Sequence, residues 1–463
     1  MKYLCCLLII SFSLKAQLHV VAETSITLPS GIYEDLYVFP VEENTLLVNF
    51  QDDYIAREKR VVVLFYNENL QLLWSGAENI PRFYEPVGQM VSGRYLYHLS
   101  REKDSKKLHL LAFHLDRMEV SSYDFETLTA MDGIGFTVFQ QKPLIYGRFN
   151  NRPVIEMHEL KEKTVKVLSD VYLKNNELKG IYFNPVREEI FVFYTPDMKC
   201  ALKFSAYDME GRLLYRKDLG EKKKKIQDFR MEVGPDGVPY LLGTYNAYCA
   251  AMVEGVFFMN LDLPAEAVFR SLLSMPFYVE SLPARQSKRL QSRKEQGKGK
   301  ETRQKGFFQT FPSFPSGILS GVDFYLSTSG PSVKNLEGRL ELPLSTYRIN
   351  HLLLADWTLE GEVIYGEARK LESEEFSVAE ARSAYVVHQE EFVPFLPTKR
   401  GLSYVVNDQI EQYLPFQNDD PWILKDIQVL SQDLKHVLVH GLADRKHGDF
   451  DQSQIYFLKK LSF

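Results

Sequence analysis

The chain has 463 residues, of which 45% are hydrophobic and 13% aromatic, and it carries a formal net charge of −6. So much apolar material excludes a mainly disordered chain, because disordered proteins are poor in aromatic and aliphatic residues. The length would suit two or three conventional domains, yet no linker rich in Pro, Gly and Ser divides the sequence.

Residues 1–16 have the features of a secretory signal peptide. Lys2 is followed by the apolar run Leu4–Ile10, and Ala16 precedes the expected cleavage point before Gln17. The run is much shorter than the ~20 residues that span a bilayer, so we expect no transmembrane segment after cleavage. The segment resembles export signals of some Gram-negative bacteria, which implies a mature chain in the periplasm, on the outer surface or secreted.

Three short segments of the mature chain share one pattern. They read YNENLQLLW from Tyr66, YDMEGRLLY from Tyr207 and WTLEGEVIY from Trp357, with an aromatic residue at each end. A polar turn separates two apolar stretches, so each segment predicts a hairpin of two strands. Recurrence of such a unit indicates a repeat architecture, in which each unit buries its apolar face against the next.

Weaker copies of this pattern lie between and after the three strong ones. Aligned on the strand that precedes the turn, the register positions are Tyr66, Phe113, Met157, Tyr207, Asn260, Trp357, Val406 and Phe457. The first four steps are 47, 44, 50 and 53 residues, and the next step is 97. A period of ~40–50 residues with several short strands is typical of a propeller blade of four antiparallel strands.

At the level of the fold, the sequence therefore resembles the β-propellers over most of residues 30–463. The resemblance implies an all-β structure, with a β-propeller of seven or eight four-stranded blades in residues 17–463. Both counts stay open because the 97-residue step contains either a long insertion or a degenerate blade. A pair of β-sandwich domains is the competing architecture, and the steady step disfavours it.

Other segments predict the remaining strands. Glu189–Tyr194 is a continuous apolar and aromatic run, which suits a strand that is buried on both faces. Val233–Tyr245 and Leu430–Gly441 each place a polar turn before a strand. We expect an N-terminal strand near Leu18–Leu28 to complete the last blade beside Gln454–Leu461, since this pairing removes two exposed sheet edges.

One segment breaks the pattern. Residues 284–305 hold nine basic and two acidic residues, with no aromatic residue, whereas the rest of the mature chain has a net charge of −15. We predict a disordered basic loop, because this composition cannot bury enough apolar surface to order itself. Its basic residues are Arg285, Lys288, Arg289, Arg293, Lys294, Lys298, Lys300, Arg303 and Lys305. They are candidate contacts for a polyanion or an acidic protein patch, and the alternative is a dispensable insertion between strands.

The mature chain contains two cysteines, Cys200 and Cys249, separated by 49 residues, about one repeat. In an exported protein they can form a disulfide between comparable levels of adjacent blades. They can equally be two separate buried thiols that behave as small hydrophobic residues. A C-x-x-C redox motif is absent from the sequence.

Motifs of several enzyme classes are absent from the sequence. It contains no G-x-S-x-G, H-E-x-x-H, EF-hand loop or Gly-rich phosphate loop, and no Asp-box of the sialidase-type propellers. Gly317–Gly321 places its serine one position too late for a nucleophile elbow. We therefore predict no catalytic residue and no cofactor.

Two further groups of residues have a simpler structural explanation. The stretch HGLADRKHGDFD brings together the metal-ligand types His440, Asp444, His447, Asp449 and Asp451. Their spacing matches no established site and a solvated turn accounts for them, so we predict no metal. The tyrosines Tyr240, Tyr245 and Tyr248 would suit a platform for sugars or peptides, but packing between blades explains them equally well.

Two classes of function fit these observations. The first is a non-catalytic binding or scaffold protein of the cell envelope, whose partner is an envelope protein or an anionic surface polymer and not a nucleic acid. The second is a carbohydrate-active enzyme of the glycosidase type, with carboxylates gathered at the mouth of the propeller. We favour the first class.

The basic segment gives a testable prediction. Replacing residues 285–305 by a short Gly/Ser linker should leave the melting temperature nearly unchanged, because few ordered contacts are lost. If the segment is a binding arm, the replacement should abolish a salt-sensitive association with envelope fractions, measured by co-sedimentation. An association that survives the replacement would show that the segment is a dispensable insertion and not a binding arm.

Overall fold

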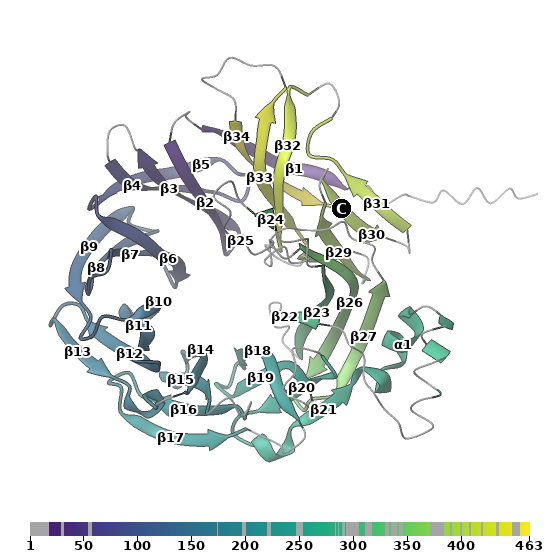
Figure 1. Cartoon of the computed structure of the whole chain (residues 1–463). Helices are drawn as coiled ribbons and strands as arrows, with labels where there is room; N and C mark the ends of the chain where they lie inside the picture. Colours follow the sequence, from purple (N-terminus) through teal and green to yellow (C-terminus); the bar gives the residue numbers. More distant parts are fainter. Residues whose placement is uncertain are drawn as a thin grey trace, which may run out of the picture.

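The structure of the chain is a computed structural model. It describes residues 18–28, 32–53, 58–173, 175–196, 201–219, 224–246, 253–282, 284–285, 287–288, 292, 305–310, 317–328, 333–334, 340–341, 346–370, 384–388, 391–398, 401–406, 409–417, 420–431, 435–446 and 454–463. Within these ranges, eight four-stranded antiparallel sheets stand around a central axis (Figure 1). The predicted β-propeller is thus confirmed, and the blade number is eight.

The first four blades follow one another without long insertions. Blade 1 consists of β2 (Ile32–Val41), β3 (Asn44–Asp53), β4 (Glu58–Tyr66) and β5 (Leu72–Ile80). Blade 2 consists of β6 (Tyr84–Ser92), β7 (Tyr95–Glu102), β8 (Lys107–His114) and β9 (Glu119–Glu126). Blade 3 consists of β10 (Asp132–Phe139), β11 (Lys142–Phe149), β12 (Arg152–Glu159) and β13 (Thr164–Val167), followed by the 3-10 turn η1 (Ser169–Val171). Blade 4 consists of β14 (Glu177–Asn184), β15 (Glu189–Thr195), β16 (Lys203–Tyr207) and β17 (Leu213–Asp218).

The second half of the ring contains the irregular elements. Blade 5 consists of β18 (Lys225–Val233), β19 (Pro239–Asn246), β20 (Gly255–Asn260) and β21 (Val268–Ser271), with η2 (Pro264–Glu266) before β21. The turn η3 (Leu272–Ser274) and helix α1 (Pro276–Ser281) follow it. Blade 6 consists of β22 (Lys305–Thr310), β23 (Gly317–Thr328), β26 (Thr346–Thr358) and β27 (Val363–Lys370). Blade 7 consists of β28 (Ala384–His388), β29 (Glu391–Pro397), β30 (Leu402–Val406) and β31 (Gln409–Tyr413). Blade 8 consists of β32 (Trp422–Ser431), β33 (Val437–Arg445), β34 (Gln454–Ser462) and β1 (His19–Leu28).

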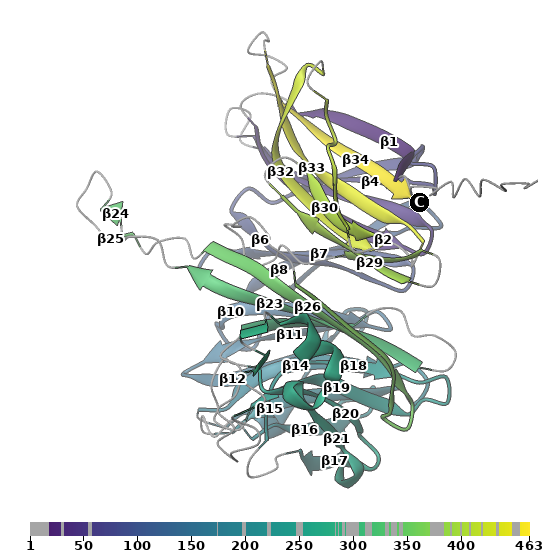
Figure 2. The ribbon, with the colours of Figure 1, turned by 90° about the vertical axis from the view of Figure 1, so that its right-hand side faces the viewer.

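All eight register positions from the sequence lie on the third strand of a blade, from Tyr66 on β4 to Phe457 on β34. The 97-residue step therefore contains no extra blade. It holds α1, the basic segment and the long pair β23 and β26. Between these two strands, the small hairpin of β24 (Val333–Lys334) and β25 (Leu340–Glu341) lies away from the ring (Figure 2).

The three strong sequence copies adopt one local structure. In each copy the third strand turns into the fourth with a hydrogen bond between backbone groups four residues apart, as between Asp208 N–H and the Arg212 carbonyl at 3.1 Å. The side chain of Asn67, Asp208 or Thr358 accepts two backbone N–H groups of its turn. A β-bulge follows in each fourth strand, so that the paired residues skip Leu73, Leu214 or Ile364.

Glycine is required at this turn in blade 4. Gly211 has a φ of +69°, where other residues are strained. A Cβ there would also lie 3.0–3.2 Å from side-chain atoms of Met157, Leu168 and Lys166 in blade 3. The turn of one blade thus packs closely on the outer strands of the blade before it.

Burial follows strand position within each blade. The second strand β19 is buried along its whole length, and β15 is buried at every residue after its first. The fourth strands alternate instead, as β9 and β17 do, because only one of their faces meets the neighbouring blade. The expectation that Glu189–Tyr194 forms a strand buried on both faces is confirmed.

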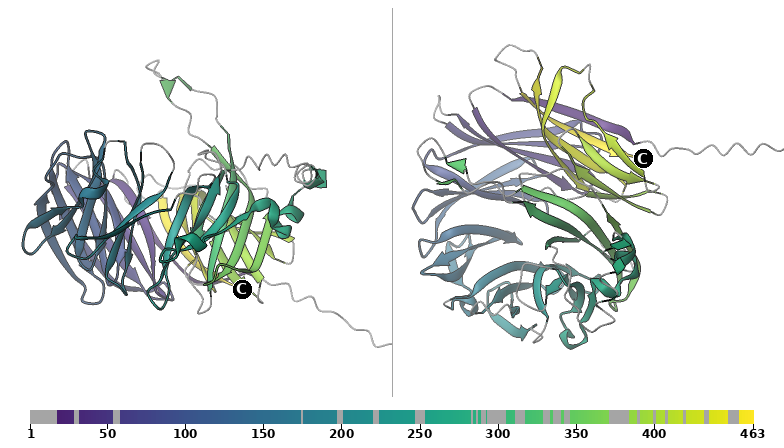
Figure 3. Two further views of the ribbon diagram at one scale, coloured as in Figure 1. Left: turned by 90° about the horizontal axis from the view of Figure 1, so that it is seen from below. Right: turned by 45° about the vertical axis from the view of Figure 1, so that its right-hand side comes forward.

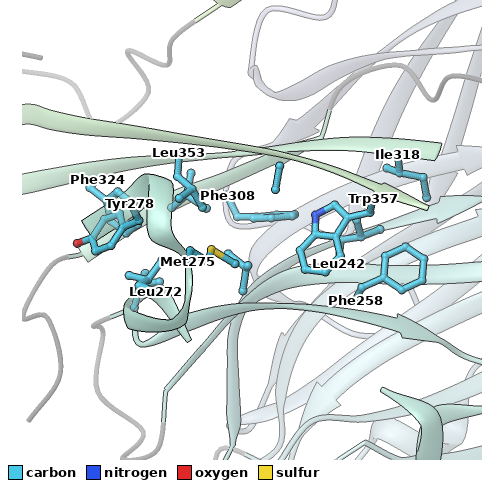
Figure 4. Close-up of a cluster of buried hydrophobic side chains, with 14 of the residues drawn as sticks. Leu242, Phe258, Leu272, Met275, Tyr278, Phe308, Ile318, Phe324, Leu353 and Trp357 are labelled. Atoms are coloured by element: carbon cyan, nitrogen blue, oxygen red, sulfur yellow. The ribbon is translucent and has the colours of Figure 1, made fainter. Parts of the chain in front are cut away.

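Helix α1 lies on the outside of the ring against β27 (Figure 3). Tyr278 of α1 and Leu272 and Met275 before it pack on Phe324 and Leu353 of blade 6, in a cluster that continues to Trp357 (Figure 4). The Trp357 indole N–H donates to Ser320 Oγ at 2.9 Å, which satisfies the polar atom inside the cluster. This cluster holds in place the point from which the basic segment starts.

The N-terminal strand closes the ring. β1 pairs antiparallel with β34 from His19 beside Ser462 to Leu28 beside Gln454, and it forms the outer strand of blade 8 (Figure 1). The predicted pairing of Leu18–Leu28 with Gln454–Leu461 is therefore confirmed. The edge of β34 that would otherwise be exposed is therefore covered by β1.

Removal of β1 should destabilise the whole protein. A chain without residues 17–28 loses the β1 ladder and exposes the edge of β34, so we expect a loss of at least ~3 kcal/mol in the free energy of unfolding, together with self-association. Urea titration and light scattering measure the two effects. A chain without residues 1–16 alone is the control, and an unchanged urea midpoint after removal of β1 would contradict the closure.

Candidate functional site

Few of the basic residues singled out in the sequence fall within the described structure. Arg285 and Lys288 follow α1 and are exposed, and Lys305 opens β22. The remaining six, Arg289, Arg293, Lys294, Lys298, Lys300 and Arg303, lie outside the described residues. Cys200 and Cys249 also lie outside them, so the disulfide stays a prediction.

The tyrosines and the C-terminal cluster have structural roles where they are described. Tyr240 and Tyr245 are buried in the cores of blade 5. His440 is buried on β33, 2.6 Å from the Tyr456 hydroxyl, and Asp444 forms an ion pair with Lys425 at 2.7 Å. Tyr248, His447, Asp449 and Asp451 lie outside the described residues. Among the residues that are described, no three His, Cys, Asp or Glu side chains are grouped as metal ligands would be.

The carboxyl groups relevant to the enzymatic alternative are Glu232 on β18 and Asp356 on β26. Burial raises the pKa of each, and a hydrogen bond from Thr310 opposes this effect at Glu232. In the described ranges, no hydrogen bond or ion pair joins the two groups. The glycosidase reading stays a prediction.

Three of the described seams between blades are bridged in a similar way, at the turn between the third and fourth strands of a blade, which we call its third turn. Lys460 of blade 8 donates to the Glu68 carbonyl in blade 1, Lys166 of blade 3 to the Glu210 carbonyl in blade 4, and Lys217 of blade 4 to the Leu261 carbonyl in blade 5. At these seams a lysine of one blade thus holds the third turn of the next blade.

The seam between blades 2 and 3 differs. In the described part of this seam, no side chain of blade 2 donates to the third turn of blade 3, which spans residues 160–163. A cleft of about 230 Å³ lies there instead. Its lining residues are Tyr95, Tyr97, Ala112, Ser121 and Tyr123 from blade 2, and Gln140, Gln141, Lys142, Glu159, Leu160 and Lys161 from blade 3.

The pairing of the strands in blade 2 explains why its wall of the cleft combines tyrosine rings with a hollow. Tyr97 on β7 pairs with Ala112 on β8, which in turn pairs with Ser121 on β9. The three side chains therefore form a row across the sheet on the face toward blade 3. Because Ala112 and Ser121 are small, the row leaves space beside the Tyr97 ring.

The tyrosines of this wall lie close together. The rings of Tyr95 and Tyr97 are stacked with centroids 5.6 Å apart, and His114 packs on Tyr95 with centroids 4.6 Å apart. Tyr97 is only 3% exposed, and burial together with the neighbouring Tyr95 and Tyr123 raises the pKa of its phenol. The Tyr97 hydroxyl therefore stays protonated at neutral pH and can donate a hydrogen bond.

The wall from blade 3 begins at a two-residue turn. Gln140 and Gln141 join β10 to β11, with φ values of +46° and +66°. Such turns favour Asn-Gly or Asp-Gly, because left-handed backbone is costly for other residues. Gln140 Nε2 donates to Glu188 of blade 4 at 3.0 Å, whereas no hydrogen bond to another described residue engages the Gln141 amide.

The charges of the cleft are mostly balanced within the protein. Lys142 Nζ lies 3.5 Å from Glu159 and also donates to the Met209 carbonyl of blade 4 at 3.0 Å. Lys161 is exposed at the rim. The interior of the cleft thus presents neutral hydroxyl and amide groups beside one internal ion pair.

Comparisons with known proteins find likeness at the level of the fold. No family model matches the sequence, and no curated protein matches it. The solved Dos1 propeller has a TM-score of 0.45 at 10% identity and covers 96% of this chain and 95% of its own. Dihydro-heme d1 dehydrogenase NirN has a TM-score of 0.44 at 12% identity over 95% and 79%, and AztD from Citrobacter koseri has 0.41 at 9% over 82% and 93%.

Sequence reasoning missed the cleft although its signals are visible. Tyr95 and Tyr97 alternate on one strand, and Tyr123 lies on the same face one hairpin later. A Gln-Gln pair stands where a tight hairpin turn would favour Asn-Gly. Neither signal has meaning until the two blades are placed next to each other.

Two buried histidines make stability depend on pH. Burial lowers the pKa of His98 to about 3, where it lies against Ser100, His109 and the Phe50 ring, and burial lowers the pKa of His440 to about 3 beside Tyr456. The unfolded chain binds these protons near pH 6.5, before the folded chain does. Stability is therefore lost as pH falls from about 6.5 toward 3.

We expect a slope of about 1.4 kcal/mol per pH unit from each of these histidines between pH 5 and 6. Urea unfolding at a series of pH values measures it. The variants His98→Gln and His440→Gln should each reduce the slope by about that amount. Equal slopes in all variants would contradict the burial of these rings as neutral groups.

Proposed function

We propose that the protein is an exported, non-catalytic binding protein of the cell envelope, and that the cleft between blades 2 and 3 is its binding site. Export is supported by residues 1–16, which have the charge, apolar run and cleavage point of a signal peptide. Nothing in the described helices adds a membrane anchor, since none has the length and apolar character to cross a bilayer.

The observation that carries the binding proposal is the set of polar groups in the cleft without partners in the described chain. The hydroxyls of Tyr95, Tyr97 and Tyr123 and the amide of Gln141 line it, and no hydrogen bond to another described residue engages them. Tyr97 is the buried member of this set, whereas Tyr95 and Tyr123 are half-buried and Gln141 is exposed at the rim. A buried hydroxyl in a folded protein is normally satisfied, so water or a ligand is expected to supply the partner of Tyr97.

The shape of the site also supports binding. The cleft lies between two rigid sheets and not on a long loop, so its walls are held before a ligand arrives and little ordering entropy is lost. The basic segment, residues 284–305, starts at the rim of blades 5 and 6 and would supply a separate, salt-dependent contact. Its role stays a prediction.

Association of the labelled mature protein with native envelope fractions tests this proposal. We expect saturable binding that the double variant Tyr95→Ala/Tyr123→Ala weakens by ~tenfold or more, because two aromatic contacts are removed. The control is Leu213→Ala/Leu214→Ala, which truncates two exposed side chains on β17 of blade 4.

Equal association of the wild-type protein and the tyrosine variant would overturn the cleft as the binding site. Circular dichroism of both double variants establishes that each retains the β fold. N-terminal sequencing of the protein recovered from a Gram-negative host should begin at Gln17, and an intact N-terminus would contradict export by this signal.

A further inference from the structure

We propose that the cleft between blades 2 and 3 binds one uncharged sugar ring, as part of a polysaccharide or glycan chain. This inference rests on the proposed function, because it names the ligand class of the same site. It follows from the hydrogen-bonding groups, ring surfaces, charge and size of the cleft.

The hydrogen-bonding groups match a ligand rich in hydroxyls. Each tyrosine hydroxyl of Tyr95, Tyr97 and Tyr123 can donate one hydrogen bond and accept others, and the Gln141 amide offers both a carbonyl and an NH₂ group. Sugar hydroxyls are likewise both donors and acceptors, so they can satisfy phenols and amides together. Tyr97 is the deepest of these groups, since its side chain is 3% exposed.

The aromatic surfaces suit the same ligand. A pyranose ring has apolar C–H faces and a polar edge, and a tyrosine has an apolar ring and a polar tip. The row Tyr97–Ala112–Ser121 places an aromatic ring beside a hollow made by two small residues. A sugar ring in this hollow would bury a C–H face while its hydroxyls reach Gln141 and Ser121 at the exposed rim.

The balance of charge favours an uncharged ligand. A cationic ligand would need a free carboxylate, and Glu159 is already paired with Lys142. An anionic ligand would need a free cation inside the cleft, and Lys142 is held by Glu159 and by the Met209 carbonyl. The cation left without such a contact, Lys161, is exposed at the rim, where salt screens it.

The size of the cleft limits the ligand to one ring. About 230 Å³ is below the ~300–1,000 Å³ of sites that enclose drug-sized ligands. A single sugar ring is smaller than such a ligand and suits this volume. Further sugar units of a chain would continue over the exposed turns of residues 140–141 and 160–163.

The backbone of the Gln140–Gln141 turn provides a second line of support. Both residues are held in left-handed conformation, which Gly or Asn would adopt at lower cost. Gln140 has a structural use, because it bonds to Glu188. Gln141 has no such bond, so its amide is available to a ligand at the rim of the cleft.

Titration of the mature protein with monosaccharides tests the inference. The uncharged probes are glucose, galactose, mannose and N-acetylglucosamine, and the charged probes are glucuronate and glucosamine, each followed by ligand-observed NMR. We expect saturable binding of at least one uncharged probe with a Kd of about 1 mM or below, as suits one small ring. Tyr97→Phe, which keeps the ring and removes the hydroxyl, should weaken it ~three- to tenfold.

The variant Gln141→Gly separates function from stability. It should weaken binding of the same probe by a similar ~three- to tenfold factor and yet raise the unfolding temperature, because glycine accepts the positive φ. The control Tyr215→Phe removes a phenolic hydroxyl from the outer strand of blade 4 and should leave binding unchanged. A merely structural Gln141 would change stability without changing the Kd.

The outcomes are distinguishable from those for the proposed function. Absence of saturable binding by any uncharged probe, or preferred binding of a charged one, would overturn the sugar inference. If the tyrosine double variant still loses its association with envelope fractions, the cleft binds a protein and the proposed function stands. If a sugar binds and Tyr97→Phe has no effect on it, the sugar binds elsewhere and the inference is overturned as well.

Discussion

The pairing of β1 with β34 is the interaction on which the rest of the ring depends. Without the pairing of β1 with β34, the contact between blades 8 and 1 would be weaker than the contact between any other two adjacent blades. Ala22 and Leu28 of β1 belong to the same buried cluster as Leu47 of blade 1 and Leu458 of blade 8. The first strand of the chain therefore completes the last sheet and also contributes to the core between the last blade and the first. Since every other blade is held between two neighbours, closure at this one seam fixes the positions of all eight.

Because the ring is closed, adjacent blades cannot move apart or together freely. Their facing surfaces therefore either pack against each other or leave a gap between them. In the seams before blades 1, 4 and 5, a lysine reaches a carbonyl of the next blade's third turn, and the surfaces fit. The seam between blades 2 and 3 has no such lysine bond among its described residues, and a cleft lined by the small side chains of Ala112 and Ser121 lies there. The gap cannot close by sliding of one blade, because the ring holds both from their far sides. A cleft of this kind is a pre-formed site, whose walls cost little to organise when a ligand binds.

Local patterns were enough to predict the strands, the repeat and the closing strand. The turn of Asp208–Arg212 is specified by a side chain that accepts its own backbone N–H groups, and the buried run Glu189–Tyr194 specifies a central strand. The blade number was left between seven and eight because the step from Asn260 to Trp357 contains α1 and a long strand pair, whose lengths no local rule limits. The cleft was not predictable in this way. Tyr240 and Tyr97 are both buried tyrosines on second strands, and the small size of the paired side chains Ala112 and Ser121 in the same sheet is what leaves a hollow beside Tyr97.

The Gln140–Gln141 turn shows how a repeat fold can accommodate a site without weakening its blades. The two residues join the first and second strands of blade 3, outside the hydrogen-bonded ladder, so the backbone cost of their positive φ values stays local. The strands on either side keep their register from Phe139 beside Lys142 to Gly135 beside Tyr146, and the register shifts only beyond that point, toward Asp132. Because each blade is stabilised mainly by its buried central strands and by its two seams, a strained turn at the rim subtracts little from the total. The rim turns are thus the positions at which such a ring can vary its side chains for recognition, while the buried strands preserve the fold.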